Sequence, residues 1–174
     1  MHPQIFAASD QVKPHRIRRR TLAREFAMQL LYETDLLVRA PGEDPVESYE
    51  ARLDELSEGD GEVRKCVDRV VRGTLEHRQD IDAVLQAVAR NWEIRRMAVV
   101  DRNILRMAVF ELTWCADIPA KVSIYEAIEL GKKFSTANSG GFANGILARV
   151  RIDLDAGKGQ GSQGPSNPLA QEPA

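Results

Sequence analysis

The sequence is poor in cysteine and contains no long apolar run. Its two cysteines, Cys66 and Cys115, are far apart and form no CxxC pair, so neither a disulfide framework nor a zinc site is predicted. No window approaches the roughly 18 apolar residues that a membrane span requires. The first residues lack the basic region and apolar run of a secretory signal. These absences favour a protein of the reducing cytoplasm that does not interact with a membrane.

Catalytic motifs are missing as well. The chain has no GxSxG, HExxH or GxxxxGK[ST] motif, which would position a nucleophilic serine, a zinc ion or nucleotide phosphates. Its three histidines are scattered. Paired acids such as Asp80 and Asp82 lie at predicted helix ends, where capping explains them. We therefore expect no enzymatic activity, no metal and no cofactor.

Positive charge is concentrated in one segment near the N-terminus. Residues 11–24 contain no acid, and their basic residues are Lys13, Arg16, Arg18, Arg19, Arg20 and Arg24. The whole chain has a net charge of −2, so the rest of the chain is clearly negative. A nearly neutral protein with one basic segment is typical of a protein that has a local anionic partner.

Apolar residues recur at three- and four-residue intervals along most of the chain, as they do in amphipathic helices. We predict helices over residues 16–37, from Asp44 and Pro45 towards 56, and over 63–75, 80–88, 97–116, 120–134 and 142–150. Residues 97–116 are apolar almost all the way round, which predicts the central helix of a bundle. No strand pattern is strong enough to predict a sheet, so the fold class is all-α.

The composition changes at both ends of this helical region. Residues 1–14 contain two prolines and no periodicity, and we predict a flexible N-terminal arm there. Residues 15–155 form the predicted all-helical domain. Residues 156–174 are rich in Gly, Ser, Gln and Pro, and such a segment cannot bury enough apolar surface to offset its ordering entropy. We predict a disordered C-terminal tail.

The arginine cluster is the main functional signal. On a helix, Arg16, Arg20 and Arg24 form a stripe that drifts by about 40° per four-residue step, with Arg19 beside it. Guanidinium groups bind phosphates through two parallel hydrogen bonds and stack on unpaired bases. Positive charge at a helix N-terminus is unfavourable to the helix dipole. We therefore favour a nucleic-acid contact over a solvated helix start whose arginines pair with acids of the second predicted helix.

Three other positions have more than one interpretation. The polar segment 135–141 and Phe142 could bind a phosphate and stack on a base, although for Phe142 alone a role in the core is favoured. Asp101 interrupts an apolar helix, which leaves open an internal ion pair, an interaction with the helix dipole or a contact to another protein. Trp92 and Trp114 are expected in the core or at its edge.

Three ordered blocks of the sequence resemble the NusB family of transcription antitermination factors: RRRTLAREFAMQLLYETD, VVDRNILRMAVFEL and DIPAKVSIYEAIELGKKFSTANSGGFANGIL. The resemblance covers about residues 16–150. It implies an all-α fold of about seven helices in two small packed bundles. It also implies binding of boxA-like single-stranded RNA in ribosomal RNA transcripts, together with the small-subunit ribosomal protein NusE and the transcription elongation complex of RNA polymerase.

The resemblance further implies roles for individual residues. The positions that match RNA-contacting residues of the family are Arg18, Arg19, Arg20, Arg24, Asn138, Ser139 and Phe142. Asp101 matches an acidic position that faces NusE. The chain departs from the family at Asn138, where an acid is common, and at Gly141, where a basic residue is frequent. Loss of the acid should not weaken RNA binding, whereas the glycine puts one phosphate contact in doubt.

Two other hypotheses stay open at this stage. The chain could be a protein-only helical adaptor whose arginines meet an acidic protein surface. It could also be an accessory domain for an RNA-modifying enzyme, because the same fold resembles a domain fused to RNA cytosine methyltransferases, although this chain has no glycine-rich cofactor loop of that kind. The resemblance is compatible with a monomer or a homodimer, and a dimer could cover the arginine face.

Overall fold

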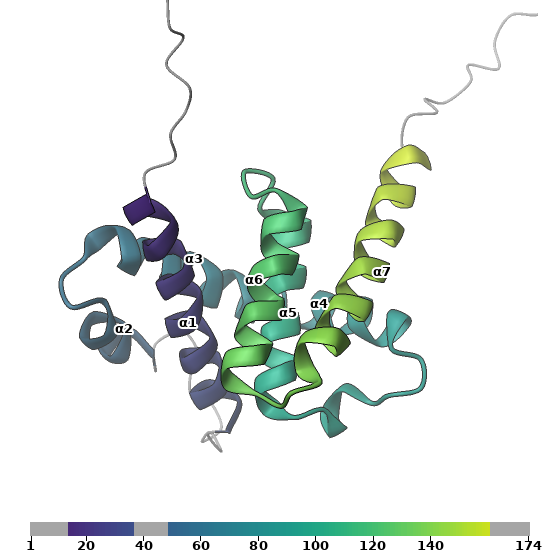
Figure 1. Cartoon of the computed structure of the whole chain (residues 1–174), viewed down its shortest axis with the longest axis horizontal. Helices are drawn as coiled ribbons and strands as arrows, with labels where there is room; N and C mark the ends of the chain where they lie inside the picture. The colour runs from purple at the N-terminus through teal and green to yellow at the C-terminus, as the bar shows by residue number, and fades with distance from the viewer. Residues whose placement is uncertain (1–13, 37–48, 161–174) are drawn as a thin grey trace, which may run out of the picture. The chain divides into compact units, whose positions relative to one another are not determined.

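The computed structural model describes residues 14–36 and 49–160, with side chains for 16–36 and 49–157. Within these residues the chain forms α-helices and one short 3-10 turn, and no strand (Figure 1). The elements are α1 (Pro14–Leu36), α2 (Glu50–Ser57), α3 (Gly61–Glu76), α4 (Arg78–Val88), η2 (Ile94–Arg96), α5 (Val99–Trp114), α6 (Ala120–Phe134) and α7 (Ser139–Gln160). The prediction of an all-α fold with about seven helices is confirmed.

The chain divides into two compact units, with the boundary after Arg78. In the first unit α1 packs along α3, and α2 contacts both of these helices. In the second unit α5, α6 and α7 pack against one another. This division agrees with the two small bundles that the family resemblance implies.

Asp60 is the N-cap residue of α3, the helix that packs along α1 in the first unit. Its carboxylate accepts hydrogen bonds from the backbone N–H groups of Glu62 (3.0 Å) and Val63 (3.2 Å) at the beginning of α3. These N–H groups have no partner within the helix, so the cap stabilises its first turn. The buried apolar face that follows consists of Val63, Val67, Val70 and Val71 on α3, and of Ala23, Ala27, Leu30 and Leu31 on α1.

α5 is the central helix of the second unit, as its apolar composition predicts. Residues 103–111 are all buried. The three polar side chains in this stretch have partners: Asn103 donates to the Val99 carbonyl (2.9 Å), Arg106 forms two hydrogen bonds with Asp82 (2.7 and 2.9 Å), and Glu111 accepts from the Ser123 hydroxyl (2.6 Å). Buried polar groups are tolerated only when they are hydrogen-bonded in this way.

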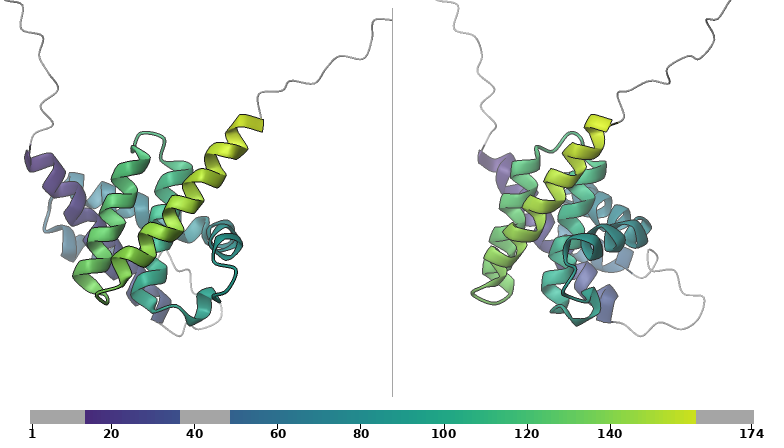
Figure 2. Two further views of the ribbon diagram at one scale, coloured as in Figure 1. Left: turned by 45° about the vertical axis from the view of Figure 1, so that its right-hand side comes forward. Right: turned by 90° about the vertical axis from the view of Figure 1, so that its right-hand side faces the viewer.

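Glycines allow α6 and α7 to approach closely. A Cβ atom at Gly131 would lie 3.3 Å from the backbone of Ser139 and Gly140, and one at Gly140 would lie 3.2 Å from the Lys132 side chain. Figure 2 shows the two helices side by side in both of its views. The start of α7 is therefore held by a tight helix–helix contact.

The prediction of a polar connection over residues 135–141 is wrong in its second half, because α7 already begins at Ser139. The backbone N–H of Thr136 donates to the Ser139 hydroxyl oxygen (3.1 Å), and the two hydroxyl groups lie 2.9 Å apart. This local hydrogen bonding and the contact with α6 outweigh the low helix propensity of the two glycines that follow. α7 then runs to Gln160, beyond the predicted domain boundary at 155.

Several predicted features lie outside the described residues. These are the N-terminal arm up to residue 13, the beginning of the second helix at Asp44 and Pro45, and the tail from residue 161 onward. Among the helices that are described, none is both long and apolar enough to cross a membrane.

The α6–α7 contact generates a stability prediction. Gly131→Ala should lower the free energy of unfolding by about 1–2 kcal/mol, because the new methyl group meets backbone that cannot easily move. Gly141→Ala is the matched control, since a Cβ there meets nothing within 4 Å, and it should leave stability unchanged or raise it by up to about 1 kcal/mol. Urea unfolding followed by circular dichroism measures both. Equal effects of the two variants would contradict the tight crossing.

Candidate nucleic-acid interface

The first turns of α1 expose three arginines, Arg16, Arg18 and Arg20. The buried face of α1 begins only at Ala23, so the preceding residues project beyond the core of the first unit. Within the described part of the chain, none of the three side chains makes a hydrogen bond or an ion pair. Helix geometry places Arg18 on roughly the opposite side of α1 from Arg16 and Arg20. The exposed positive charge therefore surrounds the start of the helix instead of following one stripe.

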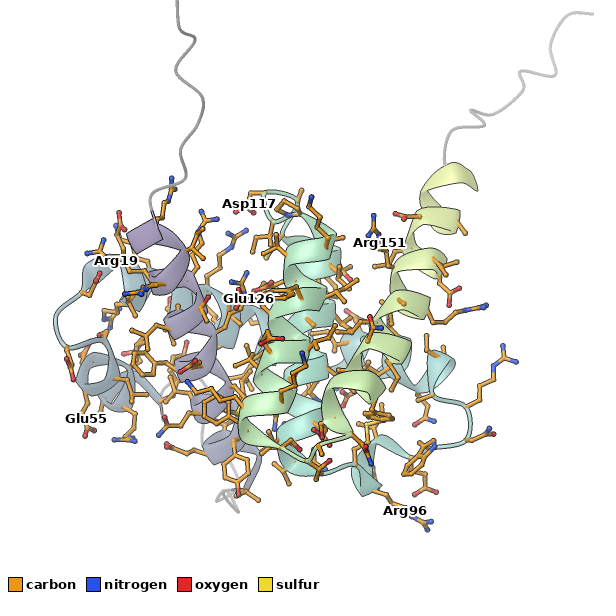
Figure 3. All side chains as sticks on the ribbon, viewed as in Figure 1. Arg19, Glu55, Arg96, Asp117, Glu126 and Arg151 are labelled. Carbon is orange, nitrogen blue, oxygen red and sulfur yellow. The ribbon has the colours of Figure 1, made fainter. Side chains whose placement is uncertain are left out.

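Arg19 is oriented differently from these three arginines. Arg19 is labelled on the first turns of α1 in Figure 3. Its Nε lies 3.0 Å from Asp60 Oδ2, and its Nη1 donates to Glu62 Oε2 at 3.0 Å. Asp60 also caps α3, so one carboxylate joins the cap of α3 to the first turns of α1. The prediction that arginines of this cluster could pair with acids holds for Arg19, but the acids belong to the start of α3 and not to the second helix.

The structure corrects the predicted arginine stripe at its last member. Arg24 is only 6% exposed, and its side chain is not free of interactions within the described chain. It lies on the same turns as the buried Ala23 and Ala27, where α1 is already packed. A contact between this side chain and RNA does not fit its burial, and the exposed part of the cluster ends at Arg20.

An open groove adjoins the arginines of α1. It has a volume of about 580 Å³, and its apolar lining includes Leu22, Phe26 and Leu56. Arg18, Arg19 and Asp60 also line it, and Arg19 and Asp60 are paired with each other. The groove thus places apolar surface directly beside the exposed positive charge of α1.

A second candidate segment lies in the second unit, at the beginning of α7. Asn138 is exposed, and its backbone carbonyl accepts a hydrogen bond from the N–H of Phe142 (3.0 Å). Ser139 is 3% exposed and has its hydroxyl engaged with Thr136, so its role is to start the helix. The prediction of an RNA contact through the Ser139 side chain does not fit this burial. Phe142 is half-buried and neither wholly a core residue nor fully open.

Trp92 is a feature that the sequence analysis missed. It was expected in the core or at its edge, but it is 59% exposed, and its ring centroid lies 6.2 Å from that of Phe142. Two hydrogen bonds fix the backbone of Trp92. Its backbone N–H donates to the Ala89 carbonyl (3.0 Å), and its backbone carbonyl accepts from the Gln86 side-chain amide (3.2 Å). The available sequence signal was the position of this tryptophan after the end of a helical pattern and among arginines.

Asp101 lies in the first turn of α5 and is partly exposed. Among the described residues it forms no ion pair, because nearby Arg106 pairs with Asp82 and the Arg102 guanidinium donates to the Arg95 carbonyl (3.3 Å). The internal ion pair considered from sequence is therefore wrong. An interaction with the helix dipole fits its position, and the carboxylate remains accessible to a partner.

The described residues also contain no group of three or more His, Cys, Asp or Glu side chains that could hold a metal ion.

The ion pairs of Arg19 generate a second prediction. Asp60→Ala should lower the free energy of unfolding by about 1–2 kcal/mol, because it removes both the α3 cap and the partner of Arg19. Arg19→Ala should cost less, about 0.5–1 kcal/mol, since the pair is partly exposed to solvent. Arg18→Ala is the control and should change stability by less than about 0.5 kcal/mol. Urea denaturation of the three variants tests this order, which a larger loss for Arg18→Ala than for Arg19→Ala would contradict.

Known proteins resemble this chain over most of its length. The sequence profile of the NusB family matches residues 21–151. The transcription antitermination protein NusB of Geobacter sulfurreducens is 48% identical over 135 residues, which cover 78% of this chain and 95% of that protein. The NusB of Myxococcus xanthus is 40% identical over 136 residues, covering 78% and 96%.

Solved structures give the same result. T. maritima NusB superposes with a TM-score of 0.69 at 36% identity and covers 77% of this chain and 91% of its own. A crystal structure of the antitermination factors NusB and NusE in complex with dsRNA contains a chain with a TM-score of 0.68 and 26% identity, covering 79% and 98%. The extent of the profile match and the identity to these relatives show that this chain belongs to the NusB family.

Proposed function

We propose that this protein is a transcription antitermination factor that binds boxA-type single-stranded RNA of ribosomal RNA transcripts together with NusE. It acts in the elongation complex of RNA polymerase, and therefore in the cytoplasm. The observation that carries the proposal is the exposure of Arg16, Arg18 and Arg20 at the start of α1, without an ion-pair partner in the described chain. Family membership supports it independently.

The exposed arginines supply the affinity for the RNA backbone. An arginine without a carboxylate partner has all its N–H donors available for phosphate oxygens. Each neutralised phosphate releases condensed counterions, which favours binding at low salt. Arg19 contributes indirectly, because its ion pairs with Asp60 and Glu62 hold the first turns of α1 in place. Arg24 is buried and makes no RNA contact in this proposal.

The start of α7 supplies contacts to bases. Asn138 presents an exposed amide that can both donate and accept hydrogen bonds, and Phe142 offers a half-open ring for stacking. Such contacts require unpaired bases, because the bases of an RNA duplex are stacked on one another. The related complex contains dsRNA. We propose that single-stranded RNA is the preferred ligand of this chain, with duplex RNA as the weaker competitor.

We propose further that Asp101 contacts NusE and that the chain is an adaptor that catalyses no reaction. The accessible carboxylate at the first turn of α5 supports the first proposal. The crystal structure that holds a NusB chain together with NusE supports the existence of such a partner. A carboxylate that forms no ion pair in the described chain can bind a cationic side chain of a partner without first breaking an internal pair.

The exposed arginines can be tested with two double variants that remove equal charge. Arg18→Ala/Arg20→Ala should weaken boxA-type RNA binding by about 10- to 100-fold. It should also make the plot of log K against log salt shallower by about 1.4, because two phosphate contacts are lost. The control Arg149→Ala/Arg151→Ala removes exposed arginines that pair with Asp153 and Asp155 on α7, and should change affinity less than threefold. Fluorescence anisotropy at several salt concentrations measures both, with scrambled and duplex RNA as competitors. Equal effects of the two double variants would reduce the proposal to nonspecific charge attraction.

Asp101→Arg tests the proposed NusE contact. Charge reversal should weaken NusE binding by about tenfold or more, because an attractive pair becomes repulsive, while binding of RNA by the isolated chain should not decrease. Asp153→Arg provides an exposed charge reversal elsewhere on the second unit. Isothermal titration with NusE measures the affinity. Unchanged NusE affinity in Asp101→Arg would contradict the assignment.

A further inference from the structure

Trp92 and Phe142 form an exposed aromatic pair in the second unit. Their ring centroids are 6.2 Å apart, and the ring planes are tilted by 60°. Trp92 is 59% exposed, whereas the other tryptophan, Trp114, is 36% exposed and stacks on Phe110 at 6.0 Å. Trp92 thus leaves a large apolar surface open to water, which costs hydrophobic free energy unless a partner covers it.

The turn that carries Trp92 is fixed by hydrogen bonds. The Trp92 N–H donates to the Ala89 carbonyl, and the Gln86 side-chain amide donates to the carbonyls of both Ala89 (3.4 Å) and Trp92 (3.2 Å). Ile94, two residues further on, is buried and anchors the following 3-10 turn. The indole ring is therefore presented by a defined backbone, which reduces the entropy lost when a ligand binds.

The charged residues around Trp92 are predominantly basic. Arg90, Arg95 and Arg96 are all exposed, and the only acid among residues 90–96 is Glu93, which pairs with Arg96 (3.2 Å). The side chains of Arg90 and Arg95 form no ion pair with the described residues. An aromatic surface flanked by available guanidinium groups has the chemistry of a single-stranded nucleic-acid site, in which bases stack while cations follow the phosphates.

We infer that Trp92 and Phe142 together form a stacking platform for an unpaired RNA base, with Arg90 and Arg95 binding the adjacent phosphates. The inference rests on the proposed RNA-binding function and adds to it a base-contacting tryptophan and two arginines outside the predicted set. A protein partner could also cover an exposed tryptophan. The excess of arginine over acid in this segment, and the tilted contact with Phe142, favour the RNA base.

The two tryptophans of the chain allow a direct spectroscopic test with a boxA-type RNA oligonucleotide. Trp114→Phe leaves Trp92 as the single tryptophan, and its fluorescence should be quenched as RNA binds because a base stacks on the indole. Trp92→Phe leaves only Trp114, whose fluorescence should change little. Trp92→Ala should weaken RNA binding by roughly 5- to 150-fold, the range for loss of one base–aromatic stack, whereas Trp92→Phe should retain most of the affinity.

The outcomes separate this inference from the proposed function. RNA affinity within twofold of the unmodified chain for Trp92→Ala would overturn the inference. If the Arg18→Ala/Arg20→Ala variant were still impaired, the proposed function would stand without it. Loss of NusE binding alone in Trp92→Ala would show that the platform serves a protein and would likewise overturn it. Absence of RNA binding by the unmodified chain would overturn both. Circular dichroism and thermal unfolding of each variant establish that any loss of affinity occurs in a folded protein.

Discussion

The exposure of Arg16, Arg18 and Arg20 depends on how the first turns of α1 are held against the first unit. Its buried face begins at Ala23, and the ion pairs of Arg19 with Asp60 and Glu62 tie the preceding turns to α3. The same Asp60 carboxylate caps α3. One local cluster of charges therefore fixes two helix starts at once. It neutralises one arginine and leaves its neighbours available to an external anion.

In the second unit, the close contact between α6 and α7 fixes the start of a helix, as the ion pairs of Arg19 do in the first unit. Gly131 and Gly140 permit close contact between α6 and α7, and the hydroxyl groups of Thr136 and Ser139 fix the first turn of α7. Phe142, one turn later, is thereby held against Trp92. Positive charge supplies affinity with little sequence information, whereas aromatic and amide groups can distinguish bases. We propose that the two units divide these tasks.

Much of the fold could be predicted from the sequence, because apolar periodicity reports directly on burial. The bounds of α6 agree with the prediction, and the central position of α5 follows from its apolar composition. The sequence places Ser139 in a loop, whereas it begins α7. The close contact with α6 favours a helix there, and local helix propensity contains no information on such a tertiary contact.

The individual roles of the arginines are harder to predict from the sequence than the fold. A charge cluster does not reveal that Arg19 pairs with acids 41 and 43 positions later, or that Arg24 is buried. Trp92 was missed for the opposite reason, since its size predicts burial while its turn holds it outward. For the arginines, exposure or burial depends on contacts with residues that are distant in sequence. For Trp92, it depends on the hydrogen bonds of a turn.

We propose that RNA binds at the start of α1 and around the Trp92–Phe142 pair. The most direct measurement is a titration of ¹⁵N-labelled protein with boxA-type RNA, followed by NMR. We expect the largest chemical-shift changes at residues 16–20, at 90–96, including the Trp92 indole N–H, and at 138–142. Changes concentrated elsewhere, for example on the C-terminal half of α7, with these segments unaffected, would contradict RNA binding at these sites.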